Sequence, residues 1–392
     1  MKSHCRTILG LLLSGAVACG GSGNGGTGTG GTTGTGGNAD SGADSTMNSS
    51  PGSGGTTGTG GMVNTGGQSS TAGGGNGGKT ATGGNSGAGG DVAPPGFWDA
   101  GTIPAAKNVM TFVFLNRSNG KLADSEIVWS FKSGSISETH SLAAQSTYDM
   151  PANSSGRLYF YLCPAGEASC ATDPSKSKYF DFIEHTIGAT QYNGNTTRVD
   201  AFGIKIAMHL HCADGFDVAV GENYATFQED RAVTFQRFLD AVPDEFKPLA
   251  QAPHAPYRIV EPGAEGFGKG GAYATYYDSF VALLWAANGL TIAKPGPNGS
   301  GLASYPDISA AIFRHVGDLA GTFDANGKLL DKNLWKDSST FYRTAPANYY
   351  ARFWHANALG GRAYGFPYDD VGSYSSYISH ANPQSLLVAI GW

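Results

Sequence analysis

The chain has 392 residues, of which 60 are glycine, and a formal net charge of −6. Half of the glycines, 30 by count, lie between Gly20 and Gly90. They have no every-third spacing and almost no accompanying proline, which excludes collagen. The acidic balance makes the chain a poor binder of polyanions, so we expect no nucleic-acid partner. The composition indicates two parts, a linker and a folded body long enough for one large domain or two smaller ones.

Residues 1–18 are typical of a secretory signal peptide. Lys2 and Arg6 precede a short apolar run, and small residues follow it up to Cys19. These small residues also resemble a bacterial lipoprotein processing site, in which Cys19 becomes the lipidated first residue of the mature protein. The alternative is an ordinary cleavage site with an incidental cysteine. We expect export, with a lipid anchor at the bacterial outer membrane or cell surface as the only membrane contact, or else secretion.

Residues 19–92 form a segment of glycine, threonine, serine and asparagine. Such a segment has too little apolar surface to offset the entropy of the chain, so it is predicted to be a disordered linker. Its physical role would be a tether between the anchor and the body.

The cysteines of the body are consistent with export. Cys163 and Cys170 bracket a short loop between strand-like flanks, and this spacing favours a disulfide in an oxidising compartment. Cys212 would then be unpaired and buried as a small apolar residue.

The body begins with β-strands. Apolar and β-branched runs separated by turn residues predict strands at 109–116, 127–131, 157–162, 178–187 and 196–211. Several short strands in this arrangement are typical of an antiparallel sandwich or barrel.

The middle of the body has a helical period instead. Apolar spacing predicts a helix over 226–241 and another over 307–319, and 277–287 is either a helix or a buried segment. From 352 onward the pattern returns to short aromatic segments. We therefore expect a mainly β protein with a mixed α/β part, divided into a β domain at 93–221, a mixed α/β domain at 222–350 and C-terminal strands at 351–392 that return to the β domain.

Two carboxylates stand out by position. Glu184 lies on the same predicted strand face as Phe180 and Phe182, and Asp200 lies on the next predicted strand, after a Gly- and Asn-rich loop at 188–195. A hairpin can bring both onto one face, among apolar neighbours that raise the pKa of a carboxyl group. Glycosidic hydrolysis needs such an unequal pair. The alternative is a solvated acid or an ion pair with the nearby Arg198.

Several motifs resemble one enzyme family. The segments 182–186 and 195–203, with sixteen residues from Glu184 to Asp200, are similar to glycoside hydrolase family 64, and so are 156–160, 364–372 and 388–392. Members of this family are β-1,3-glucanases, including the laminaripentaose-producing type. The resemblance covers about 107–392.

The resemblance implies a thaumatin-like β domain (a sandwich or barrel) and a mixed α/β domain that flank a wide groove. It also implies inverting hydrolysis of a β-1,3-glucan, such as laminarin or curdlan, to oligosaccharides. Glu184 would be the general acid and Asp200 the general base, with carboxyl groups roughly 6.5–9.5 Å apart. We expect a monomer that needs no cofactor. The alternative is a non-catalytic thaumatin-like β-glucan-binding surface protein, which the presence of both carboxylates disfavours.

Candidate sugar-binding residues lie near these motifs. Thr186 and Thr197 can hydrogen-bond sugar hydroxyls, although Thr186 can also be an ordinary surface threonine. Consecutive strand residues point to opposite faces, so at most one residue of the Asp369–Asp370 pair faces a groove, and a turn or cap role is the alternative. The full set of candidates is Thr186, Asn195, Thr197, Tyr368, Asp369 and Asp370.

One histidine pair deserves a metal-binding test. His209 and His211 are two apart on a predicted strand and therefore share a face. Such a pair can bind a metal ion, but the sequence shows no evident third ligand. We therefore expect no metal site.

Overall fold

The computed structural model describes residues 91–165, 171–268, 270–280, 282–283, 326, 328, 338, 341–343, 345–367, 369 and 374–392. They belong to one compact unit, Gly83–Trp392. The predicted signal peptide, nearly all of the predicted linker and the helix predicted at 307–319 lie outside the described residues. Among the helices that are described, none has both the length and the hydropathy that crossing a membrane requires.

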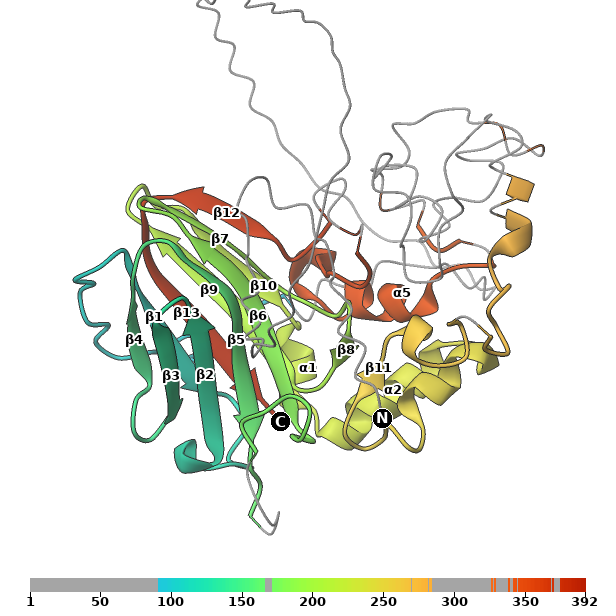
Figure 1. Ribbon diagram of the computed structural model, residues 1–392, viewed down its shortest axis with the longest axis horizontal. Helices are drawn as coiled ribbons and strands as arrows, with labels where there is room; N and C mark the ends of the chain where they lie inside the picture. Colours follow the sequence, from blue (N-terminus) through green and yellow to red (C-terminus); the bar gives the residue numbers. More distant parts are fainter. Residues whose placement is uncertain are drawn as a thin grey trace, which may run out of the picture. The chain divides into compact units, whose positions relative to one another are not determined.

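Two stacked β-sheets form the larger part of this unit (Figure 1). One sheet has the strand order β12-β7-β6-β5-β2-β3, and the other has the order β10-β9-β13-β1-β4. Their strands are β1 Met110–Asn116, β2 Ile127–Ser133, β3 Ile136–Ser141, β4 Thr147–Met150, β5 Ser154–Leu162, β6 Phe180–Ile187, β7 Gln191–Thr196, β9 Lys205–Cys212, β10 Asp217–Gly221, β12 Ile378–Ala381 and β13 Pro383–Gly391.

The pairing joins the two ends of the body. β13 lies between β1, to which it is parallel, and β9, to which it is antiparallel. The other ladders between the described strands are antiparallel. The last strand of the chain is therefore an interior strand of its sheet.

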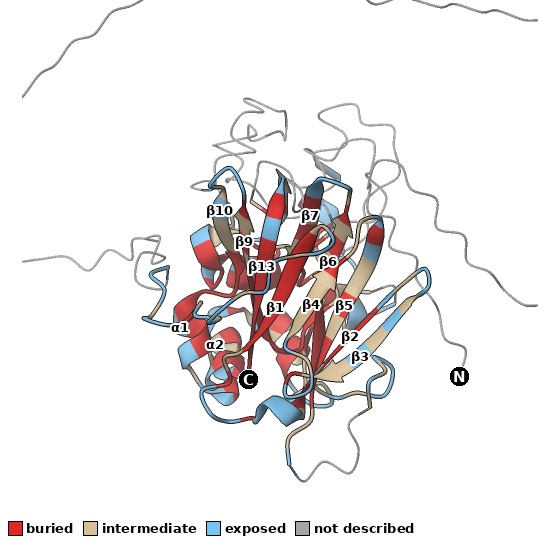
Figure 2. Ribbon diagram, turned by 90° about the vertical axis from the view of Figure 1, so that its left-hand side faces the viewer, coloured by how far each residue is buried: buried red, intermediate tan, exposed pale blue. Residues whose placement is uncertain are grey.

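The main hydrophobic core fills the space between the sheets. Strand alternation sends every second side chain inward, and Figure 2 shows the buried residues running along the strands. Trp129, Phe160 and Ile183 of one sheet join Phe112 and Met208 of the other in this core, all with no exposed surface. The predicted mainly β fold is confirmed, and of the two predicted forms the structure shows a sandwich.

A smaller helical part adjoins the sheets (Figure 1). It has its own core, in which Phe202, Phe238, Tyr350 and Trp354 pack together. Its elements include α1 Tyr224–Gln228, α2 Arg231–Ala241, α5 Tyr349–Ala356, the short strands β8 Ala201–Phe202 and β11 Ile259–Val260, and the 3-10 turns η2 Asp244–Ala250, η3 Pro262–Ala264 and η6 Leu359–Gly361; a further turn, η1 Asp124–Glu126, precedes β2. α5 crosses the domain boundary predicted at residue 350.

The helix predicted at 226–241 is two helices. The backbone is extended at Glu229 and Asp230, which end α1 and begin α2. The carbonyl of Glu229 accepts a hydrogen bond from Lys205 Nζ, and its carboxylate accepts one from the Thr234 hydroxyl. These contacts stabilise the extended backbone between the two helices. Of the segment predicted at 277–287, residues 278–280 and 282–283 are helical, and the residues beyond 283 are not described.

The prediction of a single strand at 196–211 is also wrong, and so is the prediction of a loop at 188–195. β7 occupies most of that loop, and an irregular segment and the short β8 precede β9. Gly194 of β7 explains part of the difference, because a Cβ there would lie 2.2 Å from the hydroxyl oxygen of Tyr192. Glycine here permits close strand packing rather than a loop.

Candidate active site

The β6–β7 hairpin positions the first carboxylate. In β6, the side chains of Asp181, Ile183 and His185 are buried, whereas Glu184 faces outward with 40 % of its side chain exposed. Asn195 of β7 lies directly opposite Glu184 in the ladder. The predicted face of Glu184 is therefore the outer face of the six-stranded sheet.

A tight segment after β7 positions the second carboxylate. Thr197 Oγ1 accepts a hydrogen bond from the Val199 amide at 3.1 Å, and the Arg198 amide donates to the Tyr364 carbonyl at 2.8 Å. The Glu261 amide donates to the carbonyl of Asp200 itself. Asp200 therefore lies in a loop held on both sides, and not on a strand as predicted.

Arg198 anchors this loop on its buried side and does not pair with the exposed acids Glu184 and Asp200. Its guanidinium lies 2.7 Å from Asp181 and 2.7 Å from Glu222, and all three side chains are buried. Burial acts to lower the pKa of Arg198, but Glu222 and Asp181 outweigh it and raise the pKa. Of the predicted alternative, the partner Arg198 is therefore wrong, but an arginine does pair with the exposed acids: Arg157.

Arg157 of β5 brings the two exposed carboxylates together. Its Nε donates a hydrogen bond to Glu184 Oε1 at 3.0 Å, and its Nη1 lies 3.4 Å from Asp200 Oδ2. Burial acts to lower the pKa of Arg157, but Asp200 and Glu184 together raise it. Because the two acids bind different nitrogen atoms, one guanidinium links them while keeping them apart.

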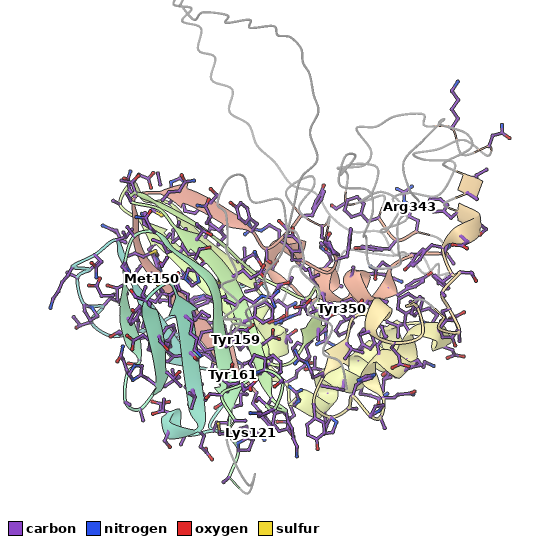
Figure 3. The ribbon with its side chains drawn as sticks, in the orientation of Figure 1. Lys121, Met150, Tyr159, Tyr161, Arg343 and Tyr350 are labelled. Atoms are coloured by element: carbon purple, nitrogen blue, oxygen red, sulfur yellow. The ribbon has the colours of Figure 1, made fainter. Side chains whose placement is uncertain are left out.

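A pocket of about 310 Å³ adjoins this arrangement, with Arg157 and Asp200 in its wall. Tyr159 belongs to its wall, on the outer face of β5 (Figure 3). Arg157 lies over the ring of Phe182 at 4.1 Å, and Arg258 lies over the ring of Phe180 at 4.0 Å. The lining residues are Arg157, Tyr159, Pro174, Phe180, Phe182, Asp200, Ala201, Arg258 and Val260. The pocket thus combines aromatic rings with charges of both signs.

The candidate sugar-binding residues on the hairpin have different surroundings. The Thr186 hydroxyl shares a hydrogen bond with the Ser155 hydroxyl at 2.9 Å, on the outer face of the sheet. The amide oxygen of Asn195 is buried and has no hydrogen-bond partner among the described residues. Thr197 is only 4 % exposed and its hydroxyl serves the loop of Asp200.

The other predicted site residues are only partly described. Asp369 is fully buried, its carboxylate accepts a hydrogen bond from the Gly365 amide at 2.7 Å, and it forms an ion pair with His355. A direct sugar contact by Asp369 would therefore require this loop to rearrange. Tyr368, Asp370, Cys19 and Cys170 lie outside the described residues. Cys163 is disulfide-bonded and Cys212 is a buried free thiol.

Arg157 and Arg258 are the charged residues of the pocket that the sequence did not predict. Arg157 was part of a family-like segment but received no role. A signal was present, because Arg157 shares a strand face with the aromatic side chains of Tyr159 and Tyr161, and an arginine is attracted to such rings. Arg258 is brought to the pocket by the chain beyond α2, which strand patterns do not reveal.

A pair of carboxylates beside an aromatic pocket is an arrangement that glycoside hydrolases use. The model of glycoside hydrolase family 64, described as beta-1,3-glucanase, matches residues 112–299 and 296–390. The chain belongs to this family, as its motifs predicted.

Solved structures and curated relatives agree with this assignment. The laminaripentaose-producing β-1,3-glucanase of Paenibacillus barengoltzii aligns with a TM-score of 0.59 and 28 % identity over 74 % of this chain and 77 % of that one, and it has also been solved with laminarihexaose. A β-1,3-glucanase domain from Clostridium beijerinckii has the same fold at 21 % identity, with a TM-score of 0.60 over 74 % of this chain and all of that one. A glucan endo-1,3-beta-glucosidase of Arthrobacter sp. (strain YCWD3) is 24 % identical over 268 residues, which are 56 % of this chain but 46 % of the relative. The chain thus spans about half the length of that curated relative.

Proposed function

We propose that the chain hydrolyses β-1,3-glucan to oligosaccharides, with Glu184 as the general acid and Asp200 as the general base. One observation carries the proposal: a single guanidinium, that of Arg157, joins both carboxylates at the edge of an aromatic pocket. Membership in a family described as beta-1,3-glucanase supports the choice of substrate. Aromatic rings are suited to the apolar faces of sugar rings, and carboxylates to their hydroxyl groups.

The proposed reaction inverts the anomeric carbon. Glu184 donates a proton to the glycosidic oxygen, and Asp200 takes a proton from the water that attacks the anomeric carbon on the opposite face. The bond to the leaving sugar breaks as the bond to water forms, so a β linkage gives an α product. The binding of the two acids to different nitrogen atoms of Arg157 favours the wide spacing of roughly 6.5–9.5 Å that leaves room for this water.

Asn195 and Thr186 are proposed to bind the sugar beside Glu184. Asn195 faces Glu184 across the ladder, and its amide oxygen has an unused acceptor site that a sugar hydroxyl can fill once a local rearrangement exposes this buried atom. Thr186 lies one outward position further along β6. Thr197 positions the loop of Asp200 through its hydrogen bond with the Val199 amide. Tyr368 and Asp370 remain sequence-based predictions.

Site-directed variants test the mechanism. Glu184→Gln and Asp200→Asn should each lower the rate of reducing-sugar release from laminarin by about 10²- to 10⁴-fold, the usual contribution of a general acid or base. Glu138→Gln is the matched control, because its carboxylate on β3 of the same sheet is 33 % exposed and pairs with His140. Wild-type rates in both site variants would overturn the mechanism. Binding of laminarin by the wild type without turnover would identify a glucan-binding protein instead.

We also propose that the protein is exported and anchored through a lipid on Cys19. The sequence around Cys19 supports this, and the glycine-rich segment after it would give the body reach. In a bacterial host, the wild type should incorporate labelled palmitate and fractionate with membranes, and Cys19→Ser should do neither. Equal labelling of both proteins would exclude Cys19 as the anchor.

A further inference from the structure

The outer face of the five-stranded sheet carries a second group of chemically active side chains. His209 and His211 alternate along β9 with Met208 and Leu210, which are fully buried in the sandwich core. The two imidazoles therefore point away from that core. The pocket lined by Arg157 and Asp200 opens on the outer face of the other sheet, so the two sites lie on opposite faces of the sandwich.

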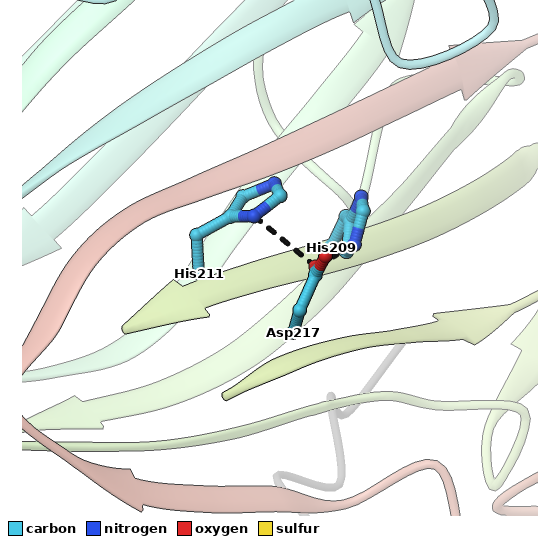
Figure 4. A group of neighbouring side chains, drawn as sticks. All are labelled: His209, His211 and Asp217. Carbon is cyan, nitrogen blue, oxygen red and sulfur yellow. Dashed lines mark ion pairs between the residues drawn. The ribbon is translucent and has the colours of Figure 1, made fainter. Parts of the chain in front are cut away.

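The structure supplies the third group that the sequence did not show. Asp217 begins β10 and lies directly opposite His211 in the antiparallel ladder, while Ala219 lies opposite His209. Asp217 Oδ1 is 3.1 Å from His211 Nδ1 and also contacts His209 Nε2. Figure 4 shows the three side chains meeting from the two neighbouring strands.

We propose that His209, His211 and Asp217 bind a divalent transition-metal ion, with Zn²⁺ as the best fit. One donor atom from each residue lies within 4.8 Å of the other two. Tetrahedral zinc with bonds of about 2.0–2.2 Å holds its ligand atoms about 3.3 Å apart, so small side-chain rotations close the site. Two imidazole nitrogens and one carboxylate oxygen form a common zinc ligand set, in which water takes the fourth position.

The surroundings of the group favour a metal over a simple ion pair. The two imidazole ring centroids are only 4.1 Å apart, so both rings can direct a nitrogen toward one ion that also contacts Asp217.

The site is also rigid on one side and open on the other. The Trp98 ring packs against His209 at 5.0 Å, and its indole N–H donates a hydrogen bond to the Tyr224 hydroxyl at 2.8 Å. Asp217 is 56 % exposed, which leaves room for a water ligand. A bound ion would link β10, the edge strand of its sheet, to β9. Cys212, which follows His211, is buried in the core and is not a ligand of this site.

Metal analysis of the full chain tests the proposal. After treatment with a chelator, the protein is dialysed against Zn²⁺ at neutral pH and its bound zinc is measured by elemental analysis. We expect one ion per chain in the wild type and at least tenfold weaker binding in both His211→Ala and Asp217→Asn. His380→Ala is the matched control, because His380 pairs with Asp214 at 2.8 Å on the surface with no third ligand among the described residues, and it should bind zinc like the wild type.

Two further readouts keep the test independent of folding defects. Zn²⁺ should raise the melting temperature of the wild type and of His380→Ala but not that of the two ligand variants, whose metal-free melting temperatures serve as the reference. Co²⁺ should give the wild type the intense visible absorption of a tetrahedral complex. Absence of saturable zinc binding in the wild type, or equal affinity in both ligand variants, would show that the three residues form only an ion pair.

Discussion

Arg157 connects the residues of the proposed active site. It binds one acid through Nε and the other through Nη1, while its guanidinium carbon lies 4.1 Å from the centre of the Phe182 ring. A lysine can offer one point charge but not two fixed donors in a plane. Arg157 is therefore a positioning residue that holds Glu184 and Asp200 in relation to each other.

Arg157→Lys tests this positioning role. We expect kcat on laminarin to fall by about 10²-fold, because displacement of catalytic groups by about 1 Å has such an effect. KM and the melting temperature should change much less than kcat. Steady-state kinetics measures kcat and KM, and thermal unfolding measures the melting temperature. A variant with wild-type kcat would show that the carboxylates hold their positions without the arginine.

His185 gives a second prediction at this scale. Its ring packs between Phe112 and Phe131 at 5.3 and 4.8 Å, and neither ring nitrogen has a hydrogen-bond partner among the described residues. Burial lowers its pKa from the ordinary 6.5 to about 3. Between these values the unfolded chain takes up a proton that the folded chain does not. The free energy of unfolding should therefore fall as the pH falls from 6.5 to about 3, by up to about 1.4 kcal/mol per pH unit.

His185→Leu should remove this contribution. Urea unfolding between pH 4 and pH 7 should give a shallower loss of stability for the variant than for the wild type, since leucine binds no proton. Identical slopes would mean that His185 is protonated in the folded protein as well.

At the scale of elements, a buried ion network fixes the loop that carries Asp200. Arg198 joins Asp181 of β6 to Glu222 beyond β10, and Glu222 also accepts a hydrogen bond from the Ile206 amide at 2.7 Å. The hydroxyl of Tyr350 in α5 donates to the Arg198 carbonyl at 2.6 Å. Both sheets and the helical part therefore meet at one arginine.

Arg198→Met should destabilise the fold strongly. The substitution leaves two buried carboxylates without their cation, and breaking such a pair from one side costs about 3–5 kcal/mol. Denaturant unfolding measures this cost. Arg352→Met on the exposed side of α5 is the matched control and should change stability by no more than about 0.5 kcal/mol. Equal small effects in both variants would refute a structural role for the network.

The sequence predicted the direction of side chains on a single strand better than the contacts between strands. Strand alternation correctly placed Glu184 on the same face of β6 as Phe180 and Phe182, because alternation depends only on the strand itself. The role of Arg157 and the third ligand Asp217 were missed, because both depend on which strands pair. Most of the loop predicted at 188–195 is strand β7, because its asparagines face outward and Gly194 is required by the nearby Tyr192 hydroxyl.

At the scale of the whole molecule, the described core begins close to Phe97. Phe97 is 5 % exposed and its ring contacts those of Tyr224 and Phe227 at 4.8 and 5.1 Å. β13, at the other end of the chain, lies between β1 and β9. The folded body therefore depends on residues from about 97 through to its last strand.

Truncations test this boundary. A chain that starts at Asp91 should keep the melting temperature and the kcat/KM on laminarin of the longer protein, because its predicted linker adds no core. A chain that starts at Gly101 loses Phe97 and Trp98 and should be less stable by about 3–5 kcal/mol, the cost of removing a buried aromatic side chain. Equal stability of the two truncated chains would contradict the boundary.

The anomeric configuration of the first product tests the proposed mechanism most directly. Proton NMR during the early hydrolysis of laminarin distinguishes the α product of inversion from the β product of retention, before mutarotation mixes them. We predict that the α anomer appears first with the wild type and that Glu184→Gln forms neither anomer at a comparable rate. Early appearance of the β anomer would contradict the assignment of Asp200 as a base that activates water.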